Sequence, residues 1–272
     1  ILLSQEKKAM VGLEILRQNN ASIFGYHNGL YELNLLSGQW ELILKTDKGG
    51  YHFQEIALGD DCLYYFDWND NYIKKQDLSR ATNPHPITRV ENVANIFSLS
   101  HDGYKLAFNN TLQMRPVVFV FDIRSAEKKK IYSGIIHSLC WAYDDKSVFI
   151  ESNNKIYRVI LDEGIKQEIA EGMNPYAISQ NIIGYYKLQI ESDTKDSYAL
   201  LCKKNLLTSE EQIIRVKISS FPRGIRWSPD GRYAITPLPA FPPKVVSYQS
   251  YTKPGFWDTN TGEFYELPAF PN

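Results

Sequence analysis

Residues 227–236 read WSPDGRYAIT, and a near copy, SLSHDGYKLAF, stands at residues 98–108. In both copies a polar turn containing Asp and Gly separates two apolar stretches. Pro229 fixes its own φ angle and Gly231 accepts a positive φ, so the middle of the phrase favours a tight turn. Residues 139–150, LCWAYDDKSVFI, carry a looser version of the phrase. The recurrence predicts that each copy is the first β-hairpin of a unit that the chain repeats.

A second kind of hairpin recurs along the whole chain. Its six copies begin at Gly29, Asn71, Val117, Lys155, Ser197 and Gly255. Successive starts are 42, 46, 38, 42 and 58 residues apart, which are the differences between these positions. A four-stranded propeller blade repeats every ~40–50 residues. The spacing predicts an all-β chain that forms a single β-propeller domain over residues 1–272, with six four-stranded blades near residues 8–48, 49–91, 92–133, 134–172, 173–219 and 220–270.

These phrases also resemble a known group of proteins. WSPDGRYAIT is similar to the WD40-like repeat of TolB-type β-propellers, and GFWDTNTGEFYEL, residues 255–267, resembles the end of a WD40 blade. The sequence departs from WD40 proteins because the Gly-His dipeptide is missing and only the last blade carries Trp-Asp, at Trp257 and Asp258. The resemblance implies the fold far more than a function. It also implies that the loops between the second and third strands gather on one face, around a central channel.

A propeller protects its strand edges by closing into a ring. The segment MVGLEILR, residues 10–17, offers a strand for this closure. It can serve as the innermost strand of the first blade, or it can complete the last blade as its outer strand.

Composition excludes several classes of partner. The chain has 30 Lys and Arg against 31 Asp and Glu, a net charge of -1, so no global field attracts nucleic acid or an anionic membrane. No apolar run reaches the ~18 residues that span a bilayer. The three cysteines cannot form a complete disulfide set, so we expect free thiols and favour the cytoplasm. The chain starts without Met or a signal-peptide pattern, and a processed start would instead fit the periplasm.

A search for catalytic and metal-binding motifs finds none. The sequence lacks GxSxG, GxxxxGK[ST], HExxH and CxxC, so we expect no cofactor, no metal and no catalytic residue. The segment DWNDN, residues 67–71, places Asp and Asn at positions 1, 3 and 5 of a calcium loop. Tyr72 and Leu78 stand where that loop needs Gly and Glu, so a hairpin turn is the preferred interpretation.

The predicted binding residues lie in the loops between second and third strands. The last of these loops, residues 237–254, is long, contains five prolines and carries large aromatic side chains. Long loops of this kind often have a function, and aromatic residues anchor interfaces. The alternative is a flap that covers its own blade. The candidate partner-binding residues are Phe241, Tyr248, Tyr251, Lys253, Trp68, Asp70 and His27.

The sequence favours a non-enzymatic propeller that binds another protein. Two forms of this function stay open, an accessory subunit and an immunity protein that neutralises a cognate toxin. The alternative is an enzyme that acts on a carbohydrate or another small ligand at the channel mouth through carboxylates or histidines, or a sensor for such a ligand with Trp68 as its platform. The sequence leaves the oligomeric state open.

Overall fold

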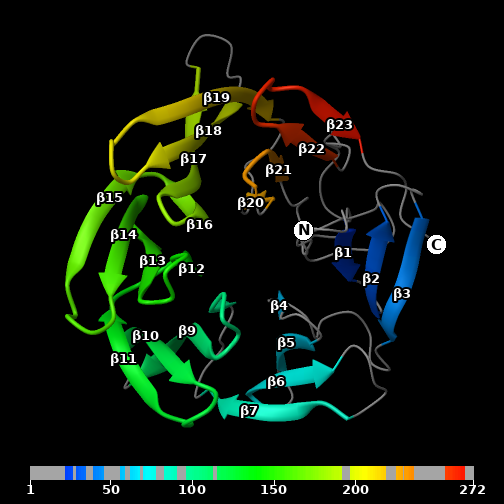
Figure 1. Cartoon of the computed structure of the whole chain (residues 1–272), viewed down its shortest axis with the longest axis vertical. Helices are drawn as coiled ribbons and strands as arrows, with labels where there is room; N and C mark the ends of the chain where they lie inside the picture. Colours follow the sequence, from blue (N-terminus) through cyan, green and yellow to red (C-terminus); the bar gives the residue numbers. More distant parts are fainter. Residues whose placement is uncertain are drawn as a thin grey trace. The chain divides into compact units, whose positions relative to one another are not determined.

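The structure is a computed structural model in which every described element is a β-strand (Figure 1). The chain divides into two compact units. The middle unit comprises residues 52–180, and the flanking unit comprises residues 1–51 and 181–272. The structure describes residues 22–26, 29–34, 39–45, 56–58, 62–67, 70–77, 83–90, 96–112, 115–191, 197–218, 225–228, 230–235 and 255–266.

Three antiparallel sheets of four consecutive strands make up most of the middle unit. The first sheet contains β4 (Ile56–Leu58), β5 (Cys62–Asp67), β6 (Tyr72–Asp77) and β7 (His85–Arg89). The second contains β8 (Phe97–Leu99), β9 (Lys105–Leu112), β10 (Arg115–Asp122) and β11 (Lys128–Ser133). The third contains β12 (Ser138–Trp141), β13 (Ser147–Ser152), β14 (Lys155–Ile160) and β15 (Lys166–Glu171).

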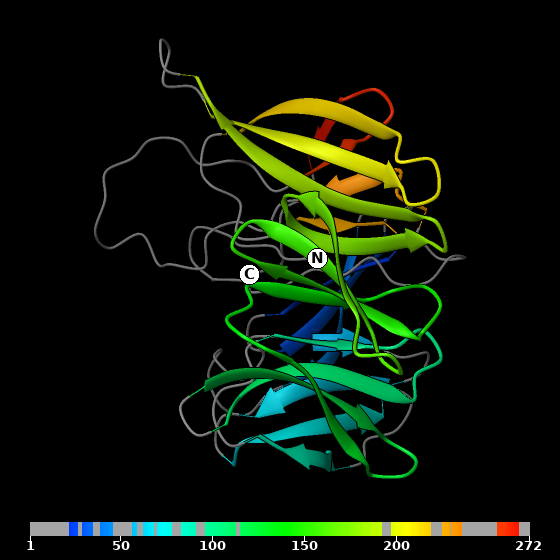
Figure 2. The same ribbon diagram turned by 90° about the vertical axis from the view of Figure 1, so that its left-hand side faces the viewer.

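The remaining strands also form sheets from strands that are consecutive in the sequence. β16 (Met173–Ser179) is the first strand of a sheet that continues with β17 (Ile182–Ile190), β18 (Ser197–Asn205) and β19 (Glu211–Ile218). The long strands β17 to β19 lie side by side (Figure 2). Another sheet contains β20 (Arg226–Trp227), β21 (Tyr233–Ile235), β22 (Gly255–Asp258) and β23 (Phe264–Glu266). The sixth has β1 (Ser22–Tyr26), β2 (Gly29–Asn34) and β3 (Gln39–Lys45), and the closing segment 10–17 lies outside the described residues.

The core of the middle unit forms because its sheets are apolar on both faces. Successive side chains on a strand point to opposite faces. On β10, Val117, Phe119 and Phe121 join a cluster with the first sheet, whereas Val118 and Val120 join a cluster with the third sheet. Full burial of one such side chain contributes ~1.5–3 kcal/mol. The run VVFVF is therefore apolar at every position because its strand lies between two sheets.

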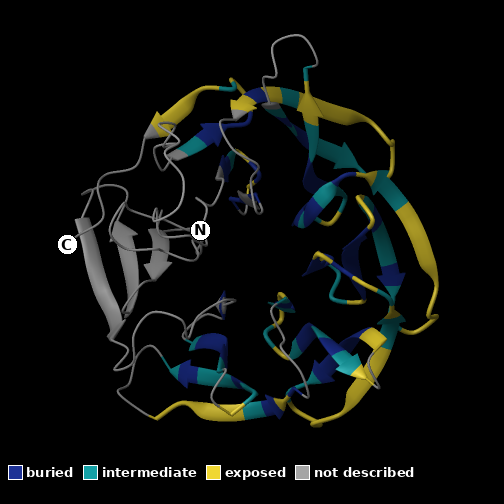
Figure 3. Cartoon of the chain, turned by 180° about the vertical axis from the view of Figure 1, so that it is seen from behind, coloured by how far each residue is buried: buried dark blue, intermediate teal, exposed yellow. Residues whose placement is uncertain are grey.

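The last strand of each sheet in the middle unit faces solvent. Exposed residues follow β7, β11 and β15 along the outer side, whereas the inner strands are mostly buried (Figure 3). Every position of β11 and β15 is exposed or half-buried, including the three lysines at residues 128–130.

The repeated phrase of the sequence forms the same turn twice. The Ser100 hydroxyl donates to Asp102 and accepts from the Lys105 amide, at 2.6 and 2.8 Å. The Ser228 hydroxyl donates to Asp230 and accepts from the Tyr233 amide in the same way. The glycines that follow the two aspartates have φ angles of 75° and 67°, which explains why glycine recurs there.

Candidate functional site

The loop end of the middle unit is the end at which the second strand of each sheet turns into the third. One backbone hydrogen bond recurs at this end in all three sheets. In each case the amide of the residue that leaves the fourth strand donates to a carbonyl in the turn between the second and third strands or, for Pro116, at the start of the third strand. The bonds run from Val90 to Asn71 at 2.8 Å, from Gly134 to Pro116 at 2.9 Å and from Gly172 to Asn154 at 2.8 Å. The connecting segments between sheets are therefore fixed to the turns of the loop end.

Asp70 is the one predicted binding residue in the described part of the chain. Its carboxylate lies 2.7 Å from the Lys74 ammonium, which also lies 2.7 Å from Asp67. Burial acts to lower the pKa of Lys74, but the hydrogen bonds that its ammonium donates to both carboxylates outweigh burial, and the pKa is raised. Asp70 also accepts the Tyr72 amide at 3.2 Å, as expected for a hairpin turn. Its side chain is 43% exposed, so a partner can still reach it.

The segment between the second and third sheets displays an apolar side chain. Ile135 is 62% exposed, whereas its neighbour Ile136 is buried at 8%. The Ser152 hydroxyl donates to the Ile135 carbonyl at 2.8 Å, and the His137 amide donates to the Glu151 carbonyl at 3.0 Å. Ile135 therefore projects from a backbone that is hydrogen-bonded on both sides.

Glu151 is a buried carboxylate at the same end. Its exposure is 5%, and Oε2 accepts the Ser138 hydroxyl at 2.8 Å and the Asn174 amide at 2.7 Å. These bonds connect β13 to the first strand of its own sheet and to β16. The φ angle of Asn174 is 54°, a conformation that asparagine tolerates better than most residues. The carboxylate acts as a connection between neighbouring strands.

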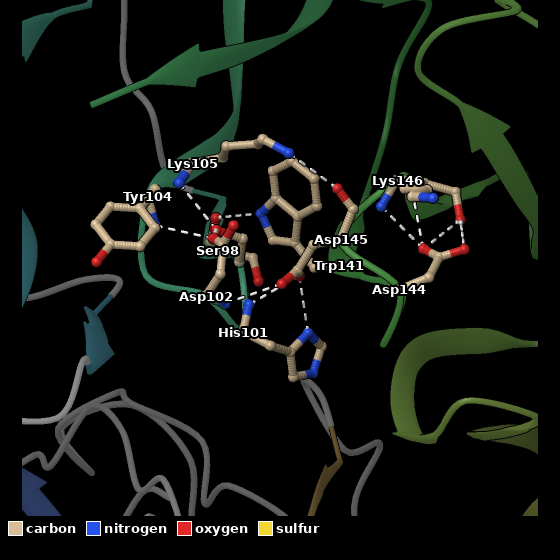
Figure 4. A network of polar contacts seen from close by, with 11 residues as sticks. Ser98, His101, Asp102, Tyr104, Lys105, Trp141, Asp144, Asp145 and Lys146 are labelled. Atoms are coloured by element: carbon tan, nitrogen blue, oxygen red, sulfur yellow. Dashed lines mark hydrogen bonds and ion pairs between the residues drawn. The ribbon is translucent and has the colours of Figure 1, made fainter. Parts of the chain in front are cut away.

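The turn end of the middle unit is the opposite end, where the first strand of each sheet turns into the second and the third into the fourth. Asp145 links two sheets there (Figure 4). Its Oδ1 accepts the His101 amide at 2.8 Å, and Oδ2 accepts the Asp102 amide at 2.9 Å. The Lys105 ammonium donates to the Asp145 carbonyl at 3.1 Å, and the Trp141 indole donates to the Ser98 carbonyl at 2.9 Å.

This network also brings together a histidine and a carboxylate, an arrangement that acid–base catalysis can use. The His101 Nδ1 atom lies 3.1 Å from Asp145 Oδ1. The His101 ring packs on Tyr143 with the ring centroids 4.8 Å apart, and Arg124 lies 3.1 Å from the centre of the Tyr104 ring. The carboxylate already accepts two backbone amides, so its clearest role is to hold one turn against the next.

The Asp145 clamp, in which this carboxylate accepts the His101 and Asp102 amides, was not predicted from the sequence. Asp145 occupies the position that glycine holds in the other two copies of the turn, and it has a positive φ of 51°. A β-carbon at such a position costs energy, so an aspartate in place of glycine was the available signal. Asn109 and Asn110 lie within β9, which extends to Leu112. The Asn109 side chain accepts the Ile96 amide at 3.1 Å.

The other predicted binding residues lie outside the described residues and stay predictions. They are His27, Trp68, Phe241, Tyr248, Tyr251 and Lys253. Within the described ranges, no group of three or more His, Cys, Asp or Glu side chains could hold a metal ion. No helix in that part of the chain is long and apolar enough to cross a membrane.

Comparison with solved structures identifies the fold. TolB from Acinetobacter baumannii superposes with a TM-score of 0.64 at 17% identity, over 97% of this chain and 64% of that chain. Oligogalacturonate lyase from Vibrio parahaemolyticus matches with a TM-score of 0.64 at 14% identity, over 98% of this chain and 80% of that chain. A chain of the nidogen–laminin complex matches with a TM-score of 0.54 at 12% identity, over 75% of this chain and 79% of that chain.

These likenesses confirm the predicted all-β fold, a β-propeller of the TolB type with the six sheets as its blades. The chain spans 64% of the length of the TolB chain that it matches. No protein-family model matches the sequence, and no curated protein is significantly similar to it.

Proposed function

We propose that the chain is a protein-binding β-propeller that holds another protein at the loop end of the middle unit and catalyses no reaction itself. The exposure of the Ile135 side chain is the observation that carries this proposal. Its side chain is 62% exposed on a backbone that hydrogen bonds hold in place. A preorganised apolar group loses little entropy on binding, and full burial of such a side chain contributes ~1.5–3 kcal/mol.

Other features of the loop end support the same function. Leu112 is 38% exposed at the end of β9, and Asp70 is 43% exposed at the turn after β5. Apolar anchors with charged residues around them are typical of protein interfaces. One solved structure with this fold is part of a complex between two proteins, nidogen and laminin.

The 237–254 segment, which belongs to the flanking unit, is a second and separate candidate for partner binding. The proposal rests on its length, its five prolines and its aromatic residues. Replacement of Tyr248 and Tyr251 together by Ala should weaken partner binding by ~2–4 kcal/mol, the effect of two interface anchors. The melting temperature should change little. A large loss of stability with normal affinity would instead identify the segment as a structural flap.

The experiment for the loop end is site-specific photo-crosslinking in the cell that makes the protein. A photoreactive phenylalanine analogue replaces Ile135, and the matched control carries it at Ile165, which is 51% exposed at the turn end. The proposal predicts one defined crosslinked protein at position 135 that is absent at position 165. Identical crosslinks at both positions, or none at position 135, would contradict it.

The identity of the crosslinked protein also separates the two forms of this function. A toxin would support an immunity protein, and a stable component of a larger complex would support an accessory subunit. The proposal includes both forms because each requires the same exposed anchor.

A small-ligand function is the second candidate. The observation that favours it is the aromatic surface at the turn end, where Tyr104 and Tyr143 are 41% and 46% exposed and His101 packs on Tyr143. One solved structure with this fold is an oligogalacturonate lyase. Incubation with oligogalacturonates, followed by chromatography, tests this candidate. Cleavage that is lost in the His101→Ala variant would favour it over protein binding.

A further inference from the structure

Most outer strands of the chain carry the same irregularity. In four sheets, the pairing of the third strand with the fourth skips one residue of the fourth strand, which is a β-bulge. The skipped residue is an isoleucine in every case. The four residues are Ile43 in β3, Ile87 in β7, Ile131 in β11 and Ile169 in β15.

These bulges have a known physical effect. A bulge bends and twists an edge strand, which prevents another strand from pairing along it. In the last sheet, the described part of β23 contains three residues and is a short edge. Each of these five outer strands is therefore protected by a bulge or by its length.

The outer strand β19 has neither protection. It pairs with β18 through eight consecutive residues, from Ser197 opposite Ile218 to Lys204 opposite Glu211, and the register does not shift. β19 is eight residues long, contains no proline and is the last strand of its sheet. Ile213 is 48% exposed on it. A long edge strand without a bulge that exposes an apolar side chain is a template for another strand.

The charges on β19 indicate which strand pairs with it. Successive side chains of a strand point to opposite faces, so residues 211, 213, 215 and 217 share one face of β19. In an antiparallel pair of two β19 strands centred on Ile214, Glu211 of each copy lies opposite Lys217 of the other. Opposite charges in directly opposed positions stabilise a strand pair, and like charges destabilise it. The twofold arrangement repeats this favourable pair at both ends.

We propose that β19 is a self-association edge, through which two copies of this chain pair their β19 strands in antiparallel orientation. The two sheets then join into one eight-stranded sheet across a twofold axis. This inference is independent of the proposed partner at the loop end, because β19 belongs to the flanking unit.

Sedimentation velocity of the purified chain, from low to high micromolar concentration, tests this inference. The wild-type chain should convert from monomer to dimer as its concentration rises. Glu211→Lys and Lys217→Glu should each place two like-charged pairs in the interface and weaken the dimer roughly tenfold. The double variant exchanges the charges and should restore dimer formation.

Two controls separate the interface from a folding effect. Glu211 also lies 3.1 Å from Lys187 within its own sheet, and the charge exchange does not restore this ion pair. Rescue by the double variant therefore reports the contact between copies. Glu168→Lys on the bulged strand β15 breaks a comparable ion pair, Lys155 to Glu168 at 3.0 Å, and should leave the dimer intact. A monomer at every concentration, or a double variant that stays as weak as the single ones, would overturn the inference.

Discussion

The two ends of the middle unit use their polar and apolar groups differently. At the turn end, the exposed rings of Tyr104 and Tyr143 contact Arg124 and His101, and Asp145 joins one turn to the next. At the loop end, hydrogen bonds hold the backbone on both sides of Ile135, while its side chain is 62% exposed. The turn end uses its side chains to hold the sheets together. The loop end combines backbone hydrogen bonds with the Ser152 hydroxyl and the buried Glu151 carboxylate for this purpose, and it presents the Ile135 side chain to solvent.

Removal of the largest side chain near the turn end should have the largest effect on stability. Trp141 is 1% exposed, packs between the second and third sheets and donates to the Ser98 carbonyl. Trp141→Ala should lower the free energy of unfolding by ~3–5 kcal/mol, measured by urea denaturation. Ile135→Ala at the loop end is the control and should change it by less than about 0.5 kcal/mol. Equal losses in the two variants would contradict the division of roles.

Removal of the Asp145 clamp should have a smaller effect. Asp145→Ala deletes the acceptors of the His101 and Asp102 amides, which should cost ~1–2 kcal/mol of stability. Asp145→Gly deletes the same acceptors but also removes the β-carbon, which is unfavourable at a φ of 51°. We therefore expect the glycine variant to be more stable than the alanine variant in thermal unfolding. The reverse order would show that strain at this residue is unimportant.

The turn end should also make stability depend on pH through Asp144. Burial acts to raise the pKa of this carboxyl, but the Lys146 amide and the Arg158 guanidinium outweigh it and lower the pKa. A lowered pKa in the folded state means that the stabilisation is present above the unfolded value of about 4 and is lost as the pH falls below it. The stability difference between wild type and Asp144→Asn should be constant near neutral pH and shrink in acid. A difference that grows in acid would contradict this sign.

The smallest expected effect is a gain in stability. Ala126 has a φ of 57° in a turn where Gly164, at the equivalent place in the next sheet, has a φ of 65°. The left-handed conformation costs alanine ~1–2 kcal/mol, and glycine loses ~0.5–1 kcal/mol more entropy on folding. Ala126→Gly should therefore stabilise the protein by about 0.5 kcal/mol, whereas Gly164→Ala should destabilise it. Differential scanning calorimetry can measure both shifts.

The sequence predicted the fold because the repeat is visible in residues with strict backbone requirements. Gly103 and Gly231 mark the same turn, and the apolar run of β10 marks a strand between two sheets. The candidate site was harder to predict because it depends on exposure and long-range contacts. Nothing in the residues around Ile135 shows that its side chain faces solvent while Ile136 is buried. The Asp145 clamp joins residues 43 and 44 positions apart, beyond any local pattern.

The most direct test of the account is the affinity of the crosslinked partner for two variants of this chain. Ile135→Asp places a charge in the proposed contact and should weaken binding by roughly tenfold to a hundredfold, with an unchanged melting temperature. Asp145→Ala should lower the melting temperature and leave the affinity of the folded protein unchanged. Titration calorimetry measures the affinity, and scanning calorimetry measures the stability. Normal affinity in Ile135→Asp together with weakened binding in Asp145→Ala would contradict the assignment of binding to the loop end.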